Sequence, residues 1–168
     1  MAIWPHYLSY FNFLAGGPAG GHRHLIDSNL DWGQDLFELR RWLERNPQNK
    51  PIGLAYYGTV EPRMAGIAYF FPPRDLNKLA GGEAALPGEE PGIQPGVYAI
   101  SVNFLQGLPF PGYMAAGRLA RIPPYAFSYF RKLAPIDRAG YSIWIFRVGP
   151  DEAKTLKALT HPPDQAGR

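Results

Sequence analysis

The sequence predicts an α/β fold, with a small, mostly parallel sheet of about four strands, flanking helices and long Pro/Gly-rich loops. Two observations lead to this class. Apolar runs of strand length occur at residues 23–27, 52–57, 97–103 and 141–148. An amphipathic helix separates the first two runs, and strand, helix and strand within roughly 35 residues form a βαβ unit with parallel strands.

The composition indicates one globular domain and excludes several other classes. Of the 168 residues, 46% are hydrophobic and 18% are charged, which is too apolar for a disordered chain and too polar for a bundle of membrane spans. Cysteine is absent, which excludes thiolate metal sites, disulfide frameworks and Cys nucleophiles. The net charge is only +3 and no basic run occurs, so we expect no nucleic-acid partner.

Residues 1–21 are expected to form an aromatic membrane-proximal segment followed by a Gly-rich loop. Pro5 and His6 interrupt the apolar stretch 1–14, which is also too short to span a bilayer. Aromatic side chains are typical of the headgroup level of a membrane, and this segment has five of them, Trp4, Tyr7, Tyr10, Phe11 and Phe13. The alternative is that these rings pack against the core of the domain itself.

Residues 22–160 are predicted to form a single α/β domain, whose clearest helix covers residues 31–45. One face of this helix carries an apolar stripe at helical spacing, formed by Trp32, Leu36, Leu39 and Leu43. Asp31 is a good N-cap residue and Gln34 completes a capping box, while Asn46 and Pro47 end the helix.

Other segments follow from local composition. Short helices are predicted at residues 61–68, 125–133 and 151–159. Proline and glycine are frequent in two stretches without periodicity, which predicts a long surface loop at 72–95 and a loop-rich segment at 107–124. Residues 161–168 are polar and expected to form a frayed tail.

Polar residues follow three of the predicted strands, where ligands of parallel sheets bind. The sequence therefore predicts a binding crevice at the carboxyl ends of the strands, lined by Asp27, Ser28, Asn29, Asp31, Thr59, Glu61, Asn103 and Gln106.

The acidic run at the start of the helix has other interpretations. Asp27, Asn29 and Asp31 occupy the first ligand positions of a calcium loop, and Asp35 and Glu38 occupy later ones. Trp32 stands where such a loop needs glycine, so we expect no metal and keep an autonomous ion- or sugar-binding module as an alternative. A second alternative is a small glycoside hydrolase that uses Glu61 with Asp27 or Asp31 as paired carboxylates.

Several motifs resemble a known family. The longest is Asp27-Ser28-Asn29-Leu30-Asp31-Trp32-Gly33-Gln34-Asp35. Shorter matching stretches are Pro5-His6-Tyr7-Leu8, Ala55-Tyr56-Tyr57-Gly58-Thr59, residues 98–103 and residues 140–147. Over most of residues 5–148 the sequence resembles the C-terminal extracytoplasmic domain of bacterial membrane glycosyltransferases of family 39, the group that includes the protein O-mannosyltransferases.

The resemblance implies a soluble extracytoplasmic domain, or fragment, of a polyprenyl-phosphate-sugar-dependent membrane glycosyltransferase on the periplasmic side of the bacterial inner membrane. The family's catalytic carboxylate is associated with a membrane bundle that this sequence does not contain, so no catalytic residue is carried over. We therefore expect an accessory or substrate-binding role without a cofactor. The expected partners are the membrane surface or that bundle, and a glycan or protein acceptor. Met1 falls where the last membrane helix would have ended, which favours a fragment, a truncated gene or a stand-alone version of the domain.

Overall fold

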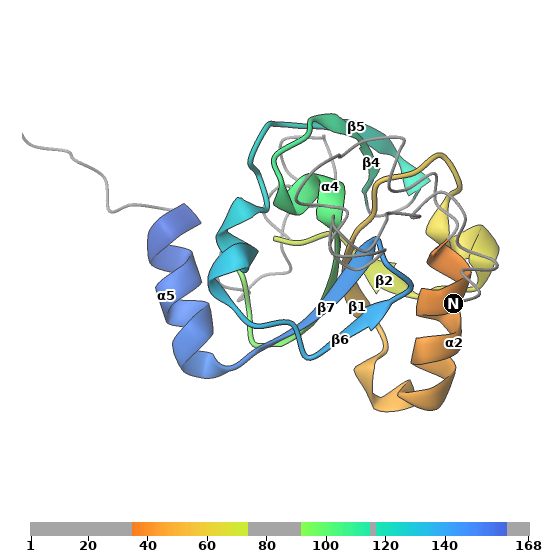
Figure 1. The fold of residues 1–168 in the computed structure, drawn as a ribbon, viewed down its shortest axis with the longest axis horizontal. Coiled ribbons are helices and arrows are strands. Elements are labelled where there is room, and N and C mark those ends of the chain that lie inside the picture. Colours follow the sequence, from red (N-terminus) through yellow and green to blue (C-terminus); the bar gives the residue numbers. More distant parts are fainter. Residues whose placement is uncertain (1–34, 74–91, 115–116, 161–168) are drawn as a thin grey trace, which may run out of the picture.

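The computed structural model describes residues 35–73, 92–114 and 117–160. In these residues the chain forms a five-stranded sheet, a two-stranded sheet and three α-helices (Figure 1). The large sheet has the strand order β2-β1-β3-β7-β6. Its strands are β1 (Ile52–Ala55), β2 (Tyr69–Phe70), β3 (Gly96–Ser101), β6 (Asp137–Ala139) and β7 (Ile143–Val148).

The α/β class is confirmed, but the expectation of a mostly parallel sheet is wrong. β1 pairs in parallel with β2 and β3, whereas β7 pairs antiparallel with both β3 and β6. The physical reason is the tight turn at Gly140, where φ is +59°, which folds β6 and β7 into a hairpin at the carboxyl ends of β1 and β3. The sheet is therefore mixed, with β7 running against its neighbours.

Helix α2 (Leu36–Arg45) confirms the described part of the predicted helix. Leu36, Leu39 and Leu43 are at most 1% exposed, as the apolar stripe predicts. At the end of the helix the Asn46 side chain donates a hydrogen bond to the Trp42 carbonyl at 2.9 Å. Asp31, Trp32 and Gln34 lie outside the described residues, as do the predicted strand 23–27 and residues 1–21.

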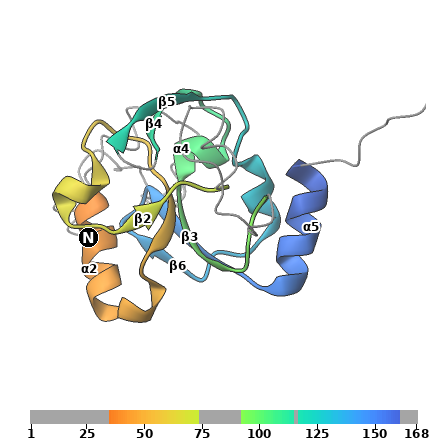
Figure 2. The ribbon, with the colours of Figure 1, turned by 180° about the vertical axis from the view of Figure 1, so that it is seen from behind.

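The large sheet separates two apolar clusters. On one face, α2 packs against side chains that include Leu54, Ile143 and Ile145. On the other face, Ile100 and Phe146 pack against the helices α4 (Val102–Leu105) and α5 (Pro150–Thr160) and the 3₁₀ helix η8 (Ser128–Lys132). Figures 1 and 2 accordingly show α2 and α5 on opposite sides of the sheet. Burial of both faces explains why the strands have nearly continuous apolar sequences.

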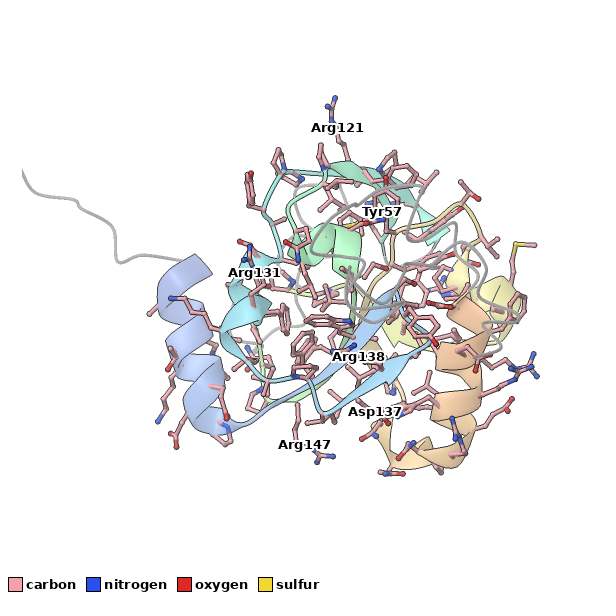
Figure 3. The ribbon with its side chains drawn as sticks, in the orientation of Figure 1. Tyr57, Arg121, Arg131, Asp137, Arg138 and Arg147 are labelled. Carbon is pink, nitrogen blue, oxygen red and sulfur yellow. The ribbon has the colours of Figure 1, made fainter. Side chains whose placement is uncertain are left out.

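The edge strand β6 is tied to α2 by a polar contact. The Trp42 indole N–H donates to the Asp137 carboxylate at 2.7 Å, and the Arg138 guanidinium lies 4.7 Å from the centre of the Trp144 ring (Figure 3). Both charged residues are exposed, which is a common protection of an edge strand against pairing with other chains.

The segment 107–124, predicted as loop-rich, contains the second sheet. β4 (Phe110–Tyr113) and β5 (Leu119–Ile122) pair antiparallel and cover the upper side of the molecule in Figure 1. The predicted helices at 61–68 and 125–133 are the shorter 3₁₀ helices η6 (Pro62–Ala65) and η8, and a further 3₁₀ turn, η5 (Pro47–Asn49), follows α2. The helix predicted at 151–159 is α5. Most of the loop predicted at 72–95 and the tail 161–168 lie outside the described residues.

Candidate functional site

The carboxyl ends of β1 and β3, where the sequence predicts the crevice, carry a buried polar cluster. Ser101, at the end of β3, is fully buried, and its hydroxyl oxygen accepts a hydrogen bond from the Tyr57 amide at 2.9 Å. The Ser142 carbonyl, just before β7, accepts a hydrogen bond from the Val102 amide at 2.7 Å. These bonds link the segments that follow β1 and β3 to each other and to the residue that precedes β7.

Asp35 completes this cluster from the start of α2. One oxygen of its fully buried carboxylate, Oδ2, accepts three hydrogen bonds of 2.8 Å, from the Tyr141 amide, the Ser142 amide and the Ser142 hydroxyl. Gly140 is required here, because a Cβ at this position would lie 2.2 Å from the Asp35 carboxyl group. We call this arrangement of Asp35 with residues 140–142 the Asp35 clasp.

Four of the eight predicted crevice residues are described, and they differ in burial. Asn103 is 1% exposed inside α4, and Gln106 is half-buried at the end of that helix. Thr59 is exposed, and its carbonyl accepts a hydrogen bond from the Tyr113 hydroxyl at 2.7 Å. Asp27, Ser28, Asn29 and Asp31 lie outside the described residues.

Glu61, the described member of the predicted carboxylate pair, is half-buried beside Tyr69. The Tyr69 hydroxyl donates toward Glu61 Oε1 at 3.4 Å and toward the Met114 carbonyl at 3.1 Å. Burial raises the pKa of Tyr69 to about 12; the Glu61 carboxylate adds to this increase, and the Arg63 guanidinium opposes it. At neutral pH Tyr69 is therefore a protonated hydrogen-bond donor, which suits a structural contact.

The described carboxylates of the calcium-loop alternative have other contacts. Asp35 belongs to the clasp, and Glu38 forms an ion pair with Arg41 one turn further along α2. Among the described residues, no group of three His, Asp or Glu side chains is placed to hold a metal ion.

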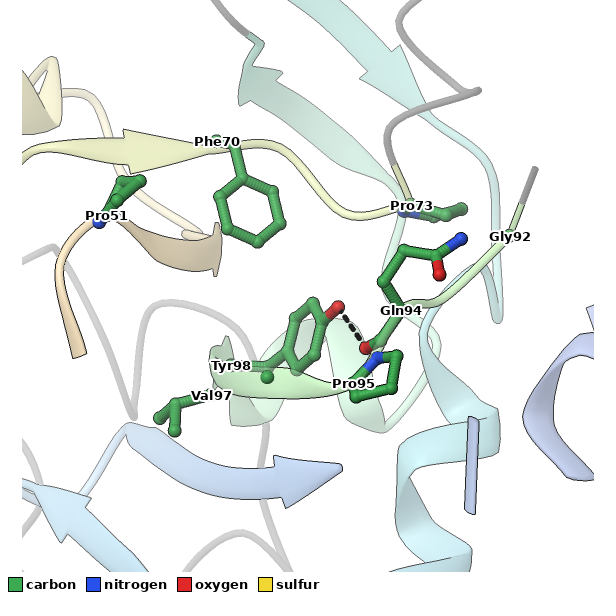
Figure 4. Close-up of a pocket in the computed structure, with 9 residues that line it drawn as sticks. Pro51, Phe70, Pro73, Gly92, Gln94, Pro95, Val97 and Tyr98 are labelled. Atoms are coloured by element: carbon green, nitrogen blue, oxygen red, sulfur yellow. Dashed lines mark hydrogen bonds between the residues drawn. The ribbon is translucent and has the colours of Figure 1, made fainter. Parts of the chain in front are cut away.

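A pocket of about 330 Å³ lies at the opposite ends of these strands, beside the first residues of β1 and β3 (Figure 4). Figure 4 shows the Phe70 and Tyr98 rings and the Gln94 side chain around one space. The Tyr98 hydroxyl donates to the backbone carbonyl of Gln94 at 2.6 Å, which links two residues of the pocket lining. The lining residues are all uncharged: Pro51, Phe70, Pro73, Gly92, Gln94, Pro95, Gly96, Val97 and Tyr98. We call this the amino-edge pocket.

Gly53 lies between two of the aromatic residues that line this pocket. It pairs with Phe70 on one side and with Tyr98 on the other, so the three residues form a row on one face of the sheet. A Cβ at Gly53 would lie 2.3 Å from the Tyr98 ring and 3.1 Å from the Phe70 ring. Because glycine has no side chain, the two rings occupy that volume and meet edge to face, with centroids 5.9 Å apart.

A second, more open hollow of about 400 Å³ shares Pro51, Pro95, Gly96 and Val97 with the amino-edge pocket. Its lining includes Lys50 and Arg147, and its character is therefore basic. Figure 3 shows Arg147 on the lower side of the molecule, far from Arg121 on the β4–β5 hairpin.

Sequence reasoning missed the amino-edge pocket. Its signals in the sequence were a glycine inside the apolar run 52–57 and prolines that precede two strands. Such signals place a turn or a close approach but do not show which side chains surround the resulting space.

The sequence matches no protein-family model, and no curated protein and no solved structure is significantly similar to it. No helix in residues 35–73, 92–114 and 117–160 has the length and apolar character that a membrane crossing requires.

Proposed function

We propose that the chain is a non-catalytic, substrate-binding extracytoplasmic domain of a polyprenyl-phosphate-sugar-dependent membrane glycosyltransferase. The observation that carries the proposal is the Asp35 clasp. Asp35 ends the longest motif of the family resemblance, and Gly140, Tyr141 and Ser142 begin another one, so two motifs far apart in the sequence meet in one buried contact.

The chemistry of the clasp favours a structural role for Asp35. A carboxylate that is fully buried and accepts three hydrogen bonds on one oxygen is held in place by its surroundings. Glu61 accepts a hydrogen bond from the Tyr69 hydroxyl of the same domain, and Asp27 and Asp31, its predicted partners for acid–base hydrolysis, lie outside the described residues. The contacts of Asp35 and Glu61 are those of side chains that hold the domain together, which supports the binding role that we propose.

The proposal is tested at the chromosomal locus. A sequence encoding an epitope tag is fused to the 3′ end of the coding sequence in the source organism, and the tagged product is analysed by size, fractionation and protease accessibility in spheroplasts. We expect a product much longer than these 168 residues, in the membrane fraction, with the tag cleaved by protease added to spheroplasts. A short tagged product in the soluble fraction, protected until the cells are lysed, would overturn the proposal and favour an autonomous binding module.

A further inference from the structure

Two cations, Lys50 and Arg147, line the open hollow of about 400 Å³ that adjoins the amino-edge pocket. We call this space the basic hollow. Both side chains are exposed, and within residues 35–73, 92–114 and 117–160 neither forms an ion pair with a carboxylate. Arg40 and Arg41 on α2, by contrast, are paired with glutamates of the same helix. Two positive charges therefore line one hollow without a described counter-charge.

The fold brings these two charges together from segments that are far apart in the sequence. Arg147 lies directly opposite Val97 in the β3–β7 pair, so both side chains project from the same face of the sheet. Val97 packs against the apolar cluster on the α2 face. Lys50 follows η5 in the connection from α2 to β1 and lines the same hollow. The basic hollow is thus formed by the sheet and by the chain that leaves α2.

One carboxylate borders the basic hollow. Glu152, in the first turn of α5, accepts a hydrogen bond of 2.8 Å from the amide of Gly149, which is a lining residue. Neither Glu152 nor Asp151 lines the hollow itself. The hydrogen bond holds the Glu152 carboxylate at the start of α5, where negative charge is favourable. Because two cations line the hollow and one bonded carboxylate borders it, the local charge is positive.

The rest of the lining suits a phosphate group on a small organic molecule. Gln48 and Asn49 contribute side-chain amides, which donate hydrogen bonds. Pro51 and Pro95 are exposed and present apolar rings. A phosphate monoester has a charge of about −1.5 to −2 at pH 7 and three acceptor oxygens, so it matches two cations better than a single carboxylate does. The volume is within the range of ligand sites and leaves room for more than the phosphate.

We propose that the basic hollow binds a small soluble phosphate monoester, whose phosphate bonds Lys50 and Arg147 and whose organic part packs on Pro51 and Pro95. A lipid headgroup offers the same phosphate chemistry. Of the large apolar side chains that the described residues expose, however, none lines the hollow, so its rim lacks the groups that insert into a bilayer. The inference goes beyond the proposed function and does not depend on it, because it uses only the charges and the lining of the hollow.

The test is a titration of the full chain followed by NMR chemical shifts, with D-glucose 6-phosphate as the monoester probe. A ligand of roughly sixteen heavy atoms in an open hollow is expected to have a dissociation constant on the order of 1 mM at low salt. Inorganic phosphate, D-glucose and D-glucuronate test the phosphate alone, the neutral ring and a single carboxylate, and each should bind at least about threefold more weakly. Raising NaCl from about 20 to about 200 mM should weaken binding of D-glucose 6-phosphate at least about threefold, because exposed charges are screened.

Variants that each remove one charge locate the site. Lys50→Gln and Arg147→Gln should each weaken binding of D-glucose 6-phosphate about three- to tenfold. The matched control is Arg121→Gln, which makes the same change of charge at an exposed arginine on the opposite side of the molecule in Figure 3 and should leave the affinity unchanged. Glu152→Gln keeps an oxygen for the Gly149 amide and removes the negative charge, so binding should tighten about twofold. Thermal unfolding of each variant shows that the fold is retained.

Several results would overturn the inference. Inorganic phosphate binding as tightly as D-glucose 6-phosphate would show that the organic part makes no contact, and D-glucuronate binding as tightly would show attraction for any anion. A loss in Arg121→Gln as large as in Lys50→Gln would show an effect of net charge alone. Sedimentation with phosphatidic acid vesicles that is lost in Lys50→Gln would assign the hollow to a lipid headgroup.

Absence of any shift at about 20 mM D-glucose 6-phosphate and low salt, well above the expected dissociation constant, would also refute the inference. None of these outcomes decides the proposed function, which depends on the length and location of the chromosomally tagged product.

Discussion

Substitution of Asp35 by Ala is expected to be among the most destabilising single changes in the domain. The three hydrogen bonds of 2.8 Å disappear, and the buried Ser142 amide and hydroxyl lose their acceptor. An unsatisfied buried group costs about 1–3 kcal/mol, so we expect a loss of about 3–5 kcal/mol in the free energy of unfolding. Asp35→Asn keeps an oxygen for the same donors and loses only the charge, so about 1–2 kcal/mol is expected.

The assay is urea-induced unfolding followed by tryptophan fluorescence, which reports on the shift of the transition midpoint at constant slope. If Asp35→Ala loses the entire folded state, the smaller effect of Asp35→Asn still measures the interaction. Thr155→Ala is the control, because its exposed hydroxyl bonds a single carbonyl within α5. A loss below about 1 kcal/mol for Asp35→Ala would refute the reasoning, since the carboxylate would then be replaceable by water.

Gly140 gives an independent check of the same contact. Gly140→Ala should cost more than the 1–2 kcal/mol or so expected for a left-handed residue alone, because its Cβ would lie 2.2 Å from the Asp35 carboxyl group. In the Asp35→Ala background that contact is removed, so Gly140→Ala should cost only the 1–2 kcal/mol or so of the left-handed conformation. Strictly additive losses in this double-mutant cycle would contradict the proposed contact.

Three further predictions concern other parts of the chain. The free energy of unfolding should fall between pH 10 and about 12, because the folded state raises the pKa of Tyr69 above its ordinary value of 10.0. The stability linked to this shift is fully present below pH 10 and is lost as Tyr69 ionises in the folded state. In Tyr69→Phe the fall should therefore be smaller, by up to about 2–3 kcal/mol. Leu39→Ala removes a fully buried side chain and should cost about 2–5 kcal/mol in urea unfolding; an effect below about 1 kcal/mol would contradict a packed α2 interface. The chain should bind liposomes weakly and with little dependence on acidic lipid. Simultaneous change of Trp4, Tyr7 and Phe11 to Ser should abolish sedimentation with vesicles and leave the circular dichroism spectrum unchanged. Unfolding of that variant would show that the rings belong to the core.

The elements that the sequence predicts well are those with a strong local pattern. The stripe of α2 identifies its buried face because only one side of that helix meets the sheet. The apolar runs locate β1, β3 and β7 to within a few residues. Their direction was not predictable in the same way, because a buried strand has the same composition whether its neighbour runs parallel or antiparallel. The antiparallel direction of β7 depends on β6, whose residues Asp137 and Arg138 are exposed and give no apolar run.

The β4–β5 hairpin shows a different limit of sequence reasoning. Pro111 and Gly112 stand inside β4, and both residues normally argue against a strand. They are tolerated because a two-stranded sheet leaves one side of each strand without a pairing partner, so a missing N–H costs little there. At Gly112 a Cβ would lie 2.9 Å from the Ile122 side chain, so the glycine also lets the hairpin close. Tertiary packing thus overrides a composition that is typical of a loop.

The Asp35 clasp also changes how the acidic motif is understood. From the sequence, the residues of this run had three interpretations, as helix cap, as calcium ligands or as a catalytic pair. Of the run, the structure describes Asp35, whose side chain does not cap the helix that it precedes and instead reaches the turn between β6 and β7. The partner of that carboxylate is more than a hundred positions away in the chain and consists mainly of backbone amides, which any residue type provides. The local sequence pattern could therefore identify the acidic motif but not the partner of Asp35. The hydrogen bonds of Asp35 are strong because the folded sheet buries its carboxylate, which the sequence pattern does not show.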